Sequence, residues 1–264
     1  MLAIISDIHS NIEALTAVLR DIESRGVKRI VCLGDVVGYG PNPCEALDLI
    51  MRHCEVTLMG NHDFAVLYEP NNFNMGAEAA CFWTRRRLEK EPDLEKRAAR
   101  WDFLGGLPVK HVISGEALGL PGVTDVTFTH GSPRRPINEY IFPDDVYNCP
   151  GKFRGLFERF NHLCFVGHTH VPGVFLETPD FYSPDELDDG VFEVSFRKAM
   201  TNVGSVGQPR DRDNRASYAI LEPNGATALV RFVRVAYNVD ATMAKVRATP
   251  ELDDYLGSRL REGR

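Results

Sequence analysis

The sequence predicts an α/β fold, because short buried strands alternate with amphipathic helices and give way to consecutive strands in the last third of the chain. Five short apolar runs are the evidence for the first, largely parallel sheet. They are residues 2–6, 30–33, 56–59, 126–129 and 163–166. Short runs rich in β-branched residues and separated by helical patterns are typical of strands buried on both faces. After Pro172 strands follow without long intervening helices, which predicts a second sheet packed on the first.

The helical patterns lie between these runs. Ser10 and Glu13 form an S-x-x-E start signal for a helix that ends before Gly26. Further helices are predicted at 42–51, 75–89, 94–104, 151–160, 239–247 and 250–261, with Pro250 at a first helical position. Further strands are predicted at 109–113, 123–129, 174–177, 191–196, 199–203, 218–221 and 227–235. The sequence Pro223-Asn224-Gly225 predicts a hairpin turn between the last two strands.

The composition is that of an ordinary globular protein, with 264 residues, 44% hydrophobic and 25% charged. We expect a single domain spanning 1–264, with residues from about 172 to 264 completing the second sheet. The polar residues singled out below extend from Asp7 to His170 with no Pro/Gly/Ser-rich linker between them. A domain boundary within that stretch would divide the site.

Charge and targeting signals narrow the class of protein. The 30 basic and 37 acidic residues give a net charge of −7, which disfavours binding to long nucleic acid without excluding a nuclease. The sequence has no basic segment before its first strand and no apolar run near the ~20 residues of a membrane span, so we expect a cytoplasmic protein with no membrane partner. Six cysteines without CxxC spacing predict reduced, mostly buried thiols.

Each of the five apolar runs ends in a side chain that can bind a metal. These side chains are Asp7, His9, Asp35, Asn61, His130, His168 and His170. In open α/β sheets the ligand crevice lies outside the carboxyl ends of the strands, so we expect them to converge there. The spacing of Asp7 and His9 predicts that both lie on one face of an extended chain, and His168 and His170 repeat it. Two aspartates, one asparagine and four histidines are sufficient for two metal ions.

The motifs carry a family resemblance. DIH at Asp7, GDVVGYG from Gly34, GNHD from Gly60, HG at His130 and GHTH from Gly167 together resemble the calcineurin-like metallophosphoesterase superfamily. NVGSVGQPR from Asn202 resembles a segment of its bacterial phosphodiesterase branch, with Val203 in place of the usual proline. The resemblance implies a four-layer α-β-β-α sandwich with two mixed sheets, and hydrolysis of phosphate esters at two divalent metal ions.

The family pattern implies a role for each residue. One ion would take Asp7, His9, His170 and Asp35, and the other Asn61, His130, His168 and the same Asp35. His62 would stabilise the charge of the transition state or protonate the leaving oxygen, which makes His62 and the bridging Asp35 the expected catalytic residues. Many relatives have a second acidic residue in GDxxD that orients this histidine. Gly38 stands at that position here, and Asp63 is the candidate substitute.

Charge indicates the substrate. Two divalent ions against two aspartates and one bridging hydroxide leave one net positive charge, which fits a phosphate group. The imidazole and carboxylate ligands favour Mn, Fe, Zn, Ni or Co over Mg or Ca. Asn61, Arg134, Arg135 and Arg210 are candidate substrate contacts. We expect attack by a metal-bridging hydroxide on a small phosphodiester or nucleotide-type substrate, in a manganese-dependent reaction. The alternatives are a metal-dependent nuclease and a non-catalytic scaffold of the same fold; the oligomeric state is not predicted.

Overall fold

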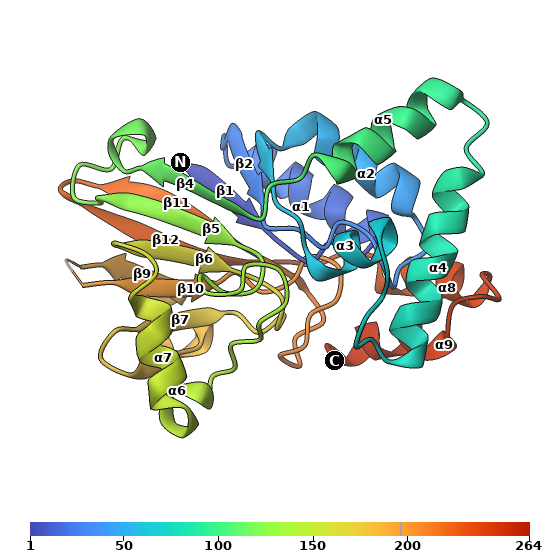
Figure 1. Ribbon diagram of the computed structural model, residues 1–264. Helices are drawn as coiled ribbons and strands as arrows, with labels where there is room; N and C mark the ends of the chain where they lie inside the picture. The colour runs from blue at the N-terminus through green and yellow to red at the C-terminus, as the bar shows by residue number, and fades with distance from the viewer. Residues whose placement is uncertain (196) are drawn as a thin grey trace.

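Two six-stranded mixed sheets form the centre of the molecule in the computed structural model, which describes residues 1–195 and 197–264 (Figure 1). The strand order is β3-β2-β1-β11-β12-β9 in the first sheet and β4-β5-β6-β10-β7-β8 in the second. Each sheet contains three consecutive parallel strands, β3-β2-β1 in the first and β5-β6-β10 in the second, and its other strands pair antiparallel with their neighbours. The prediction of two mixed sheets is confirmed.

The strands of the first sheet come from both ends of the chain. They are β1 (Leu2–Ile5), β2 (Arg29–Cys32), β3 (Val56–Thr57), β9 (Val191–Val194), β11 (Ala216–Asn224) and β12 (Thr227–Val235). Ile4 pairs with Val31 in the parallel neighbour and with Ala219 in the antiparallel one. Asn224 pairs with Thr227, so β11 and β12 form a hairpin at the predicted turn. Residue 196, the last of the strand predicted at 191–196, lies outside the described residues.

The second sheet is built from the middle of the chain. Its strands are β4 (Lys110–Ser114), β5 (Asp125–Thr129), β6 (Leu163–Val166), β7 (Gly173–Leu176), β8 (Asp180–Tyr182) and β10 (Ala199–Asn202). The expectation that all five apolar runs share one sheet was therefore wrong, since the last two runs form β5 and β6. We also expected the strands after residue 172 to complete the second sheet. Three of them, β9, β11 and β12, belong to the first sheet instead. A buried apolar run looks the same in either sheet, so the sequence pattern does not specify its partner strands.

The helices follow the predicted order with shifted ends. They are α1 (Ile12–Ser24), α2 (Pro43–His53), α3 (Asn61–Leu67), α4 (Met75–Glu89), α5 (Leu94–Gly105), α6 (Asp145–Asn148), α7 (Pro150–Phe157), α8 (Val239–Arg247) and α9 (Asp254–Ser258). Asn11, rather than Ser10, caps α1 by accepting a hydrogen bond from the Ala14 N–H. Pro250 precedes α9 instead of opening it. The short helix α3, which begins at Asn61, was not predicted.

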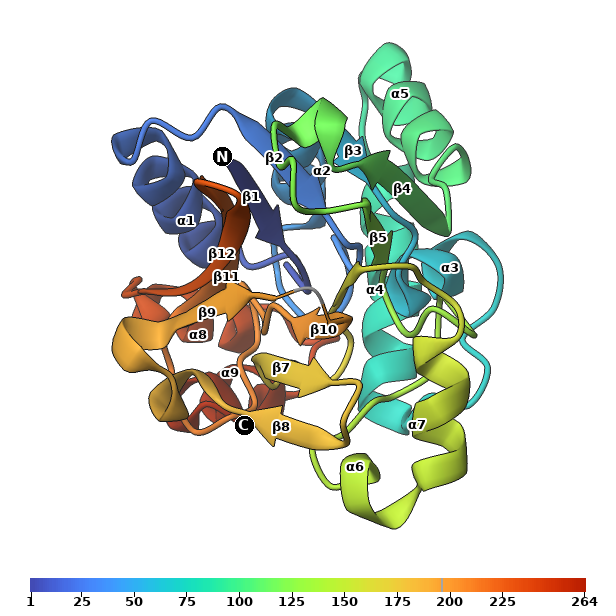
Figure 2. The ribbon, with the colours of Figure 1, turned by 90° about the vertical axis from the view of Figure 1, so that its left-hand side faces the viewer.

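Three of the four apolar clusters in the described part of the chain separate four layers, which confirms the predicted sandwich; the fourth packs α4 against α8 and α9. Alternate residues of β1 point in opposite directions: Ala3 and Ile5 pack with α1 and α2, whereas Leu2 and Ile4 pack against the second sheet. A third core lies between α7 and the outer face of the second sheet. In β6, Cys164 faces this third core, whereas the next residue, Phe165, faces the first sheet. In Figure 2, α1 lies at the left and α7 at the lower right, with the strands between them. None of the helices in the described part of the chain is long and apolar enough to cross a membrane.

Candidate metal centre

The predicted ligands converge where strands of both sheets end. Asp7 follows β1, Asp35 follows β2, Asn61 opens α3 after β3, and His130 follows β5. His168 and His170 follow β6. The carboxylates and imidazoles of this set are buried, and Asn61 is half-buried. The first sheet thus supplies the carboxylates and the second supplies three of the histidines.

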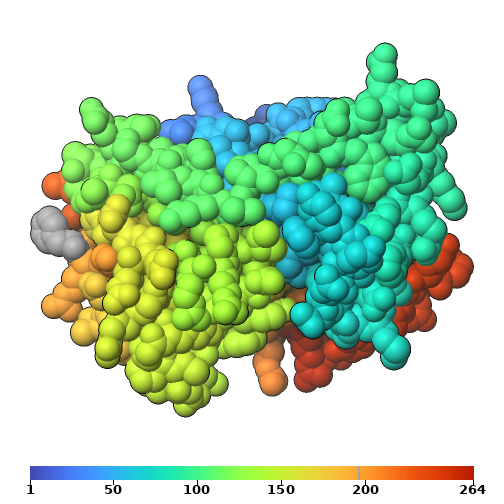
Figure 3. All heavy atoms as spheres, viewed as in Figure 1, coloured from blue at the N-terminus to red at the C-terminus, as the bar shows by residue number. Residues whose placement is uncertain are grey.

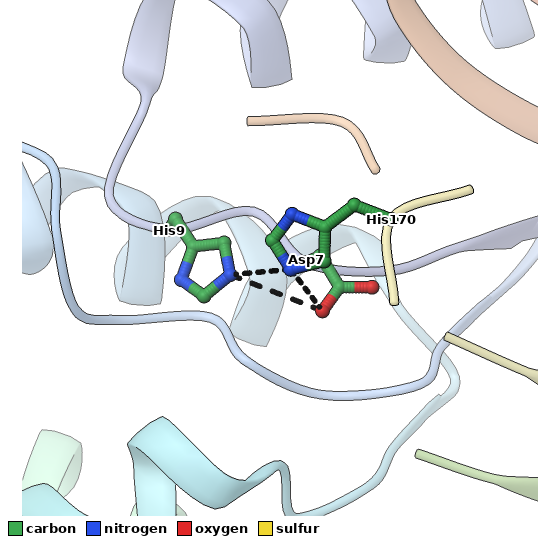
Figure 4. Close-up of side chains that lie close together, drawn as sticks. All are labelled: Asp7, His9 and His170. Carbon is green, nitrogen blue, oxygen red and sulfur yellow. Dashed lines mark hydrogen bonds and ion pairs between the residues drawn. The ribbon is translucent and has the colours of Figure 1, made fainter. Parts of the chain in front are cut away.

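One group of side chains consists of Asp7, His9 and His170 (Figure 4). The Nε2 atom of His170 lies 3.2 Å from Asp7 Oδ1 and 3.2 Å from His9 Nε2. His9 Nε2 lies 3.9 Å from the same carboxylate oxygen. Three potential donor atoms therefore point at one another, as they would around a single cation.

A second group consists of Asp35, His130 and His168. His130 Nε2 lies 3.3 Å from Asp35 Oδ2 and 3.1 Å from Asn61 Oδ1. Asp35 Oδ2 is also 3.7 Å from His9 Nε2, so this carboxylate lies between the two groups. That position is the one a ligand shared by two ions would need.

The backbone at these positions is not extended, so the expectation of an extended D-x-H segment was wrong. Ten non-glycine residues in the described part of the chain have positive φ, and five of them belong to the predicted ligand set. Those five are Asp7, His9, Asp35, His168 and His170, with φ between 47° and 67°. Left-handed backbone is costly for residues with a Cβ and is concentrated at functional sites. The chain therefore turns sharply after β1, β2 and β6, where these five buried side chains lie.

Asp63 holds the loop that carries Asp35. Its carboxylate accepts hydrogen bonds from the backbone N–H groups of Asp35 at 2.8 Å, Val36 at 3.0 Å and Gly60 at 3.0 Å. Asp35 in turn accepts the N–H of His62 at 2.8 Å. The candidate role of Asp63 in orienting the His62 ring is therefore not observed; it organises the backbone of both motifs.

The segment that begins at Asn202 forms hydrogen bonds with the turns that carry the predicted ligands. The Asn202 amide donates to the carbonyl of Gly167 at 2.7 Å, and Ser205 Oγ donates to the carbonyl of Asp7 at 2.8 Å. The Gln208 carbonyl accepts a hydrogen bond from Nδ1 of His170 at 2.6 Å. This motif thus fixes the orientation of ligand-bearing turns in both sheets.

The hydrogen bonds also fit the set to metal binding. His9 Nδ1 faces the carbonyl of Val37 at 3.3 Å, and His170 Nδ1 faces the carbonyl of Gln208, so each Nδ1 must carry the proton. Both Nε2 lone pairs then point at one another at 3.2 Å, an arrangement that a cation would stabilise. The buried Asp7 Oδ1 and His168 Nε2 have no hydrogen-bond partner in the described structure. Buried polar atoms are rarely left unpaired, and metal coordination would satisfy both.

The electrostatics indicate the same demand for positive charge. Burial by itself would raise the pKa of Asp7, but His170 and His130 hold it below its usual value. Burial favours neutral His130, yet Asp35 and Asp7 raise its pKa to about 9. Burial and the neighbouring His130 lower the pKa of His168 to about 3. A proton on His130 supplies charge that a divalent cation would supply when bound.

His62 forms a third potential metal-binding group with His9 and Asp35, and its ring packs directly on Gly38. A Cβ at residue 38 would lie 2.4 Å from His62 Nδ1, so the glycine that replaces the family's acidic residue is required by the position of the ring. The Cys81 thiol is 3.7 Å from the same nitrogen, and the Tyr39 and Phe73 rings lie 4.3 and 4.8 Å from the imidazole, centroid to centroid. Burial lowers the pKa of His62 to about 4. Packing, not a carboxylate, orients this histidine.

The predicted arginines differ in their distance from the site. Arg134 is paired with the carboxylate of Glu139 and is exposed, so its charge is already neutralised. Arg210 bonds Gln208 Oε1 at 2.7 Å, and its guanidinium carbon lies 5.8 Å from the centre of the Tyr39 ring. Arg135 is exposed, so of the three predicted arginines Arg210 is the one beside the site.

Two tyrosines of the site were missed from the sequence. Tyr39 was present in the GDVVGYG motif, and its positive φ of 56° together with its contact with His62 marks it as a site residue. The Tyr140 ring stacks on His168 at 3.9 Å, centroid to centroid, with an interplanar angle of 20°. No sequence signal marks Tyr140, because its neighbour in space is 28 positions later in the chain.

Comparison with known proteins identifies the family. The profile described as Calcineurin-like phosphoesterase matches residues 1–172, which include every predicted metal ligand. The chain belongs to the calcineurin-like phosphoesterase family. An uncharacterized protein of Methanocaldococcus jannaschii is 38% identical, and the match covers 100% of this chain and 98% of that protein.

Two solved structures resemble the whole chain. A metallophosphoesterase from Sphaerobacter thermophilus superposes with a TM-score of 0.80 at 37% identity, covering 100% of this chain and 98% of its own. A hypothetical protein from Pyrococcus horikoshii has a TM-score of 0.74 at 19% identity, covering 100% and 99%, and shares the fold. Phosphoesterase activity in general, with His and Asp clusters that can hold metal ions, is therefore supported by family and geometry together.

Proposed function

We propose that this calcineurin-like phosphoesterase hydrolyses small phosphodiesters or nucleotide-type phosphate esters with two divalent transition-metal ions. The observation that supports two ions is Asp35, whose Oδ2 lies 3.7 Å from His9 in one group and 3.3 Å from His130 in the other. When bound, the ions would activate water and draw charge from the phosphate oxygens. Mixed imidazole and carboxylate ligands favour manganese, iron, zinc, nickel or cobalt.

The chain itself supplies the remaining functions. His62 Nδ1 faces Gly38 and Cys81, which leaves Nε2 as the nitrogen available to a substrate. From Nε2, His62 donates a hydrogen bond to the leaving oxygen, where negative charge develops. Asn61 begins the same helix and would contact a phosphate oxygen. Arg210, beside Tyr39, is the arginine that would contribute further positive charge.

A small substrate is favoured over a long polyanion. The net charge of −7 disfavours non-specific binding to nucleic acid, and Arg134, which would have extended a basic surface, is neutralised by Glu139. A cytoplasmic location is part of the proposal, because all six cysteines are free thiols.

The test combines metal analysis with a hydrolysis screen. Protein purified without chelator should contain about two transition-metal ions per chain, as the two ligand groups predict. With manganese it should hydrolyse bis-p-nitrophenyl phosphate, and it should cleave plasmid or single-stranded DNA poorly at physiological salt. Ready cleavage of DNA with no activity on small diesters would favour the nuclease. A protein that binds no metal and hydrolyses no ester would be a scaffold.

A further inference from the structure

A cleft of about 360 Å³ opens beside His62 and is not explained by metal binding. Its lining includes Tyr39, Asn61, His62, Phe73 and Tyr140. In Figure 3, the cyan segment that follows β3 and the lime-green segment that follows β5 lie next to each other on the face in view. Both segments contribute lining residues to the cleft, and so does His62.

Tyr140 lines the cleft and belongs to an exposed aromatic stack. The Tyr140 ring stacks on His168 and on Phe142, the second at 5.4 Å with an interplanar angle of 10°. Tyr140 is 44% exposed and Phe142 is 47% exposed, although large aromatic side chains are usually buried. Exposed aromatic faces beside a functional site are typical platforms for stacking a flat ligand ring.

The polar part of the lining is nearly uncharged. Asn71, Asn72 and Asn138 are exposed, and each amide offers both hydrogen-bond donors and an acceptor. Among the described residues no lysine or arginine lines the cleft, and Glu69 contributes a negative charge. Such a lining suits a neutral group with hydrogen-bonding edges and disfavours a group that carries an additional phosphate.

We propose that the cleft binds the leaving arm of the substrate, and that this arm is a nucleoside without further phosphates. The inference rests on the proposed phosphodiesterase function. His62 lines the cleft, so an arm lying there is the one whose ester oxygen reaches Nε2. The base packs against the exposed surface of the Tyr140–Phe142 stack, the asparagine amides bond its polar edges, and Glu69 repels a second phosphate.

The test compares two diesters that differ only in the base. Adenosine 5′-(methyl phosphate) and ribose 5-(methyl phosphate) are incubated with the manganese-loaded enzyme, and released adenosine or ribose is measured by chromatography. We expect kcat/KM to be about 5- to 100-fold higher for the adenosine compound, the usual contribution of stacking one base on an aromatic ring. In Tyr140→Ala this ratio should approach one. Tyr147→Ala, which removes a 68% exposed tyrosine outside the cleft lining, should keep the wild-type ratio.

A second variant keeps the test decisive, because Tyr140 also contacts the proposed ligand His168. Metal content is measured in every variant. Glu69→Lys reverses the one carboxylate of the lining, and it should raise kcat/KM for the adenosine diester with a 3′-phosphate about two- to fivefold relative to the diester without one. If Tyr140→Ala loses metal, its kinetics cannot test the cleft. The gain of Glu69→Lys on the 3′-phosphorylated diester then decides whether the leaving arm binds there, and no gain would overturn the proposal.

The outcomes distinguish the two proposals. Equal kcat/KM for the adenosine and ribose compounds in wild type would overturn the nucleoside cleft and leave the phosphodiesterase function standing. Hydrolysis of bis-p-nitrophenyl phosphate but of neither methyl diester would also overturn the nucleoside cleft and leave the phosphodiesterase function standing. Failure to hydrolyse any diester with any candidate metal would overturn the proposed function, and the cleft inference with it.

Discussion

Gly38→Ala tests whether packing positions His62. An alanine Cβ at this position would lie 2.4 Å from Nδ1, 2.9 Å from Cγ and 3.1 Å from Cβ of His62. Ordinary contacts begin near 3.4 Å, so relieving the overlap requires the ring to move by about 1 Å in a closely packed interior. The ring cannot move freely, since Tyr39, Phe73 and Cys81 surround it.

The expected loss follows from that displacement. A shift of about 1 Å in a group that contacts the reacting atoms can cost about 10²-fold in rate. We therefore expect kcat to fall about 10²-fold, with both metal ions retained, because no predicted ligand is changed. Alanine at the φ of +91° should also lower the free energy of unfolding by about 1–2 kcal/mol.

Gly119→Ala is the matched control. Gly119 also has positive φ, +68°, but an added Cβ would meet nothing within 4 Å. Its backbone cost should be similar and its kcat unchanged. The assay is hydrolysis of bis-p-nitrophenyl phosphate, with metal content and thermal unfolding measured for both variants. Wild-type kcat in Gly38→Ala would refute the packing argument, as would an equal loss in the control.

Three further predictions concern the ligands, the proton donor and the stability of the fold. Asp35→Ala should lower metal content at both sites and Asn61→Ala chiefly at one; an Asp35→Ala protein with two ions per chain would contradict the bridging role. His62→Asn should keep its metal while kcat falls about 10²–10⁴-fold, and less with a nitrophenolate leaving group; wild-type turnover of an alkyl ester would exclude the assigned role. Burial would raise the pKa of Asp21, but hydrogen bonds from Arg25 and from Tyr218 Oη, the second at 2.6 Å, hold it below its usual value. Tyr218→Phe should therefore destabilise the protein by about 1 kcal/mol above pH 4, and the difference should shrink as the pH falls and Asp21 is protonated; an unfolding difference that is independent of pH would argue against this pair.

The local pattern determined the elements and the residues of the candidate site. Apolar runs of four or five residues identified the central strands, and the polar residue after each run identified Asp7, Asp35, His130 and His168, which the structure brings together. These inferences succeeded because burial and strand ends are local properties that depend on a few consecutive residues.

The tertiary structure alone decided which strands share a sheet. The run that forms β1 pairs with β11, more than 200 positions later, and β6 pairs with β10. Both sheets are buried on their inner faces by the same kinds of residue, so hydrophobic periodicity cannot assign a run to one or the other. Partner choice depends on packing summed over the whole molecule.

The surroundings of His62 show the same division at the scale of single atoms. The sequence placed the histidine beside Asn61, and the missing acidic residue at Gly38 was visible as a departure from the family. That the ring fills the space left by this glycine, against Cys81 and Tyr39, became visible only in three dimensions. Contacts between residues far apart in the chain are fixed by how the layers pack, and a one-dimensional pattern carries no distance between them.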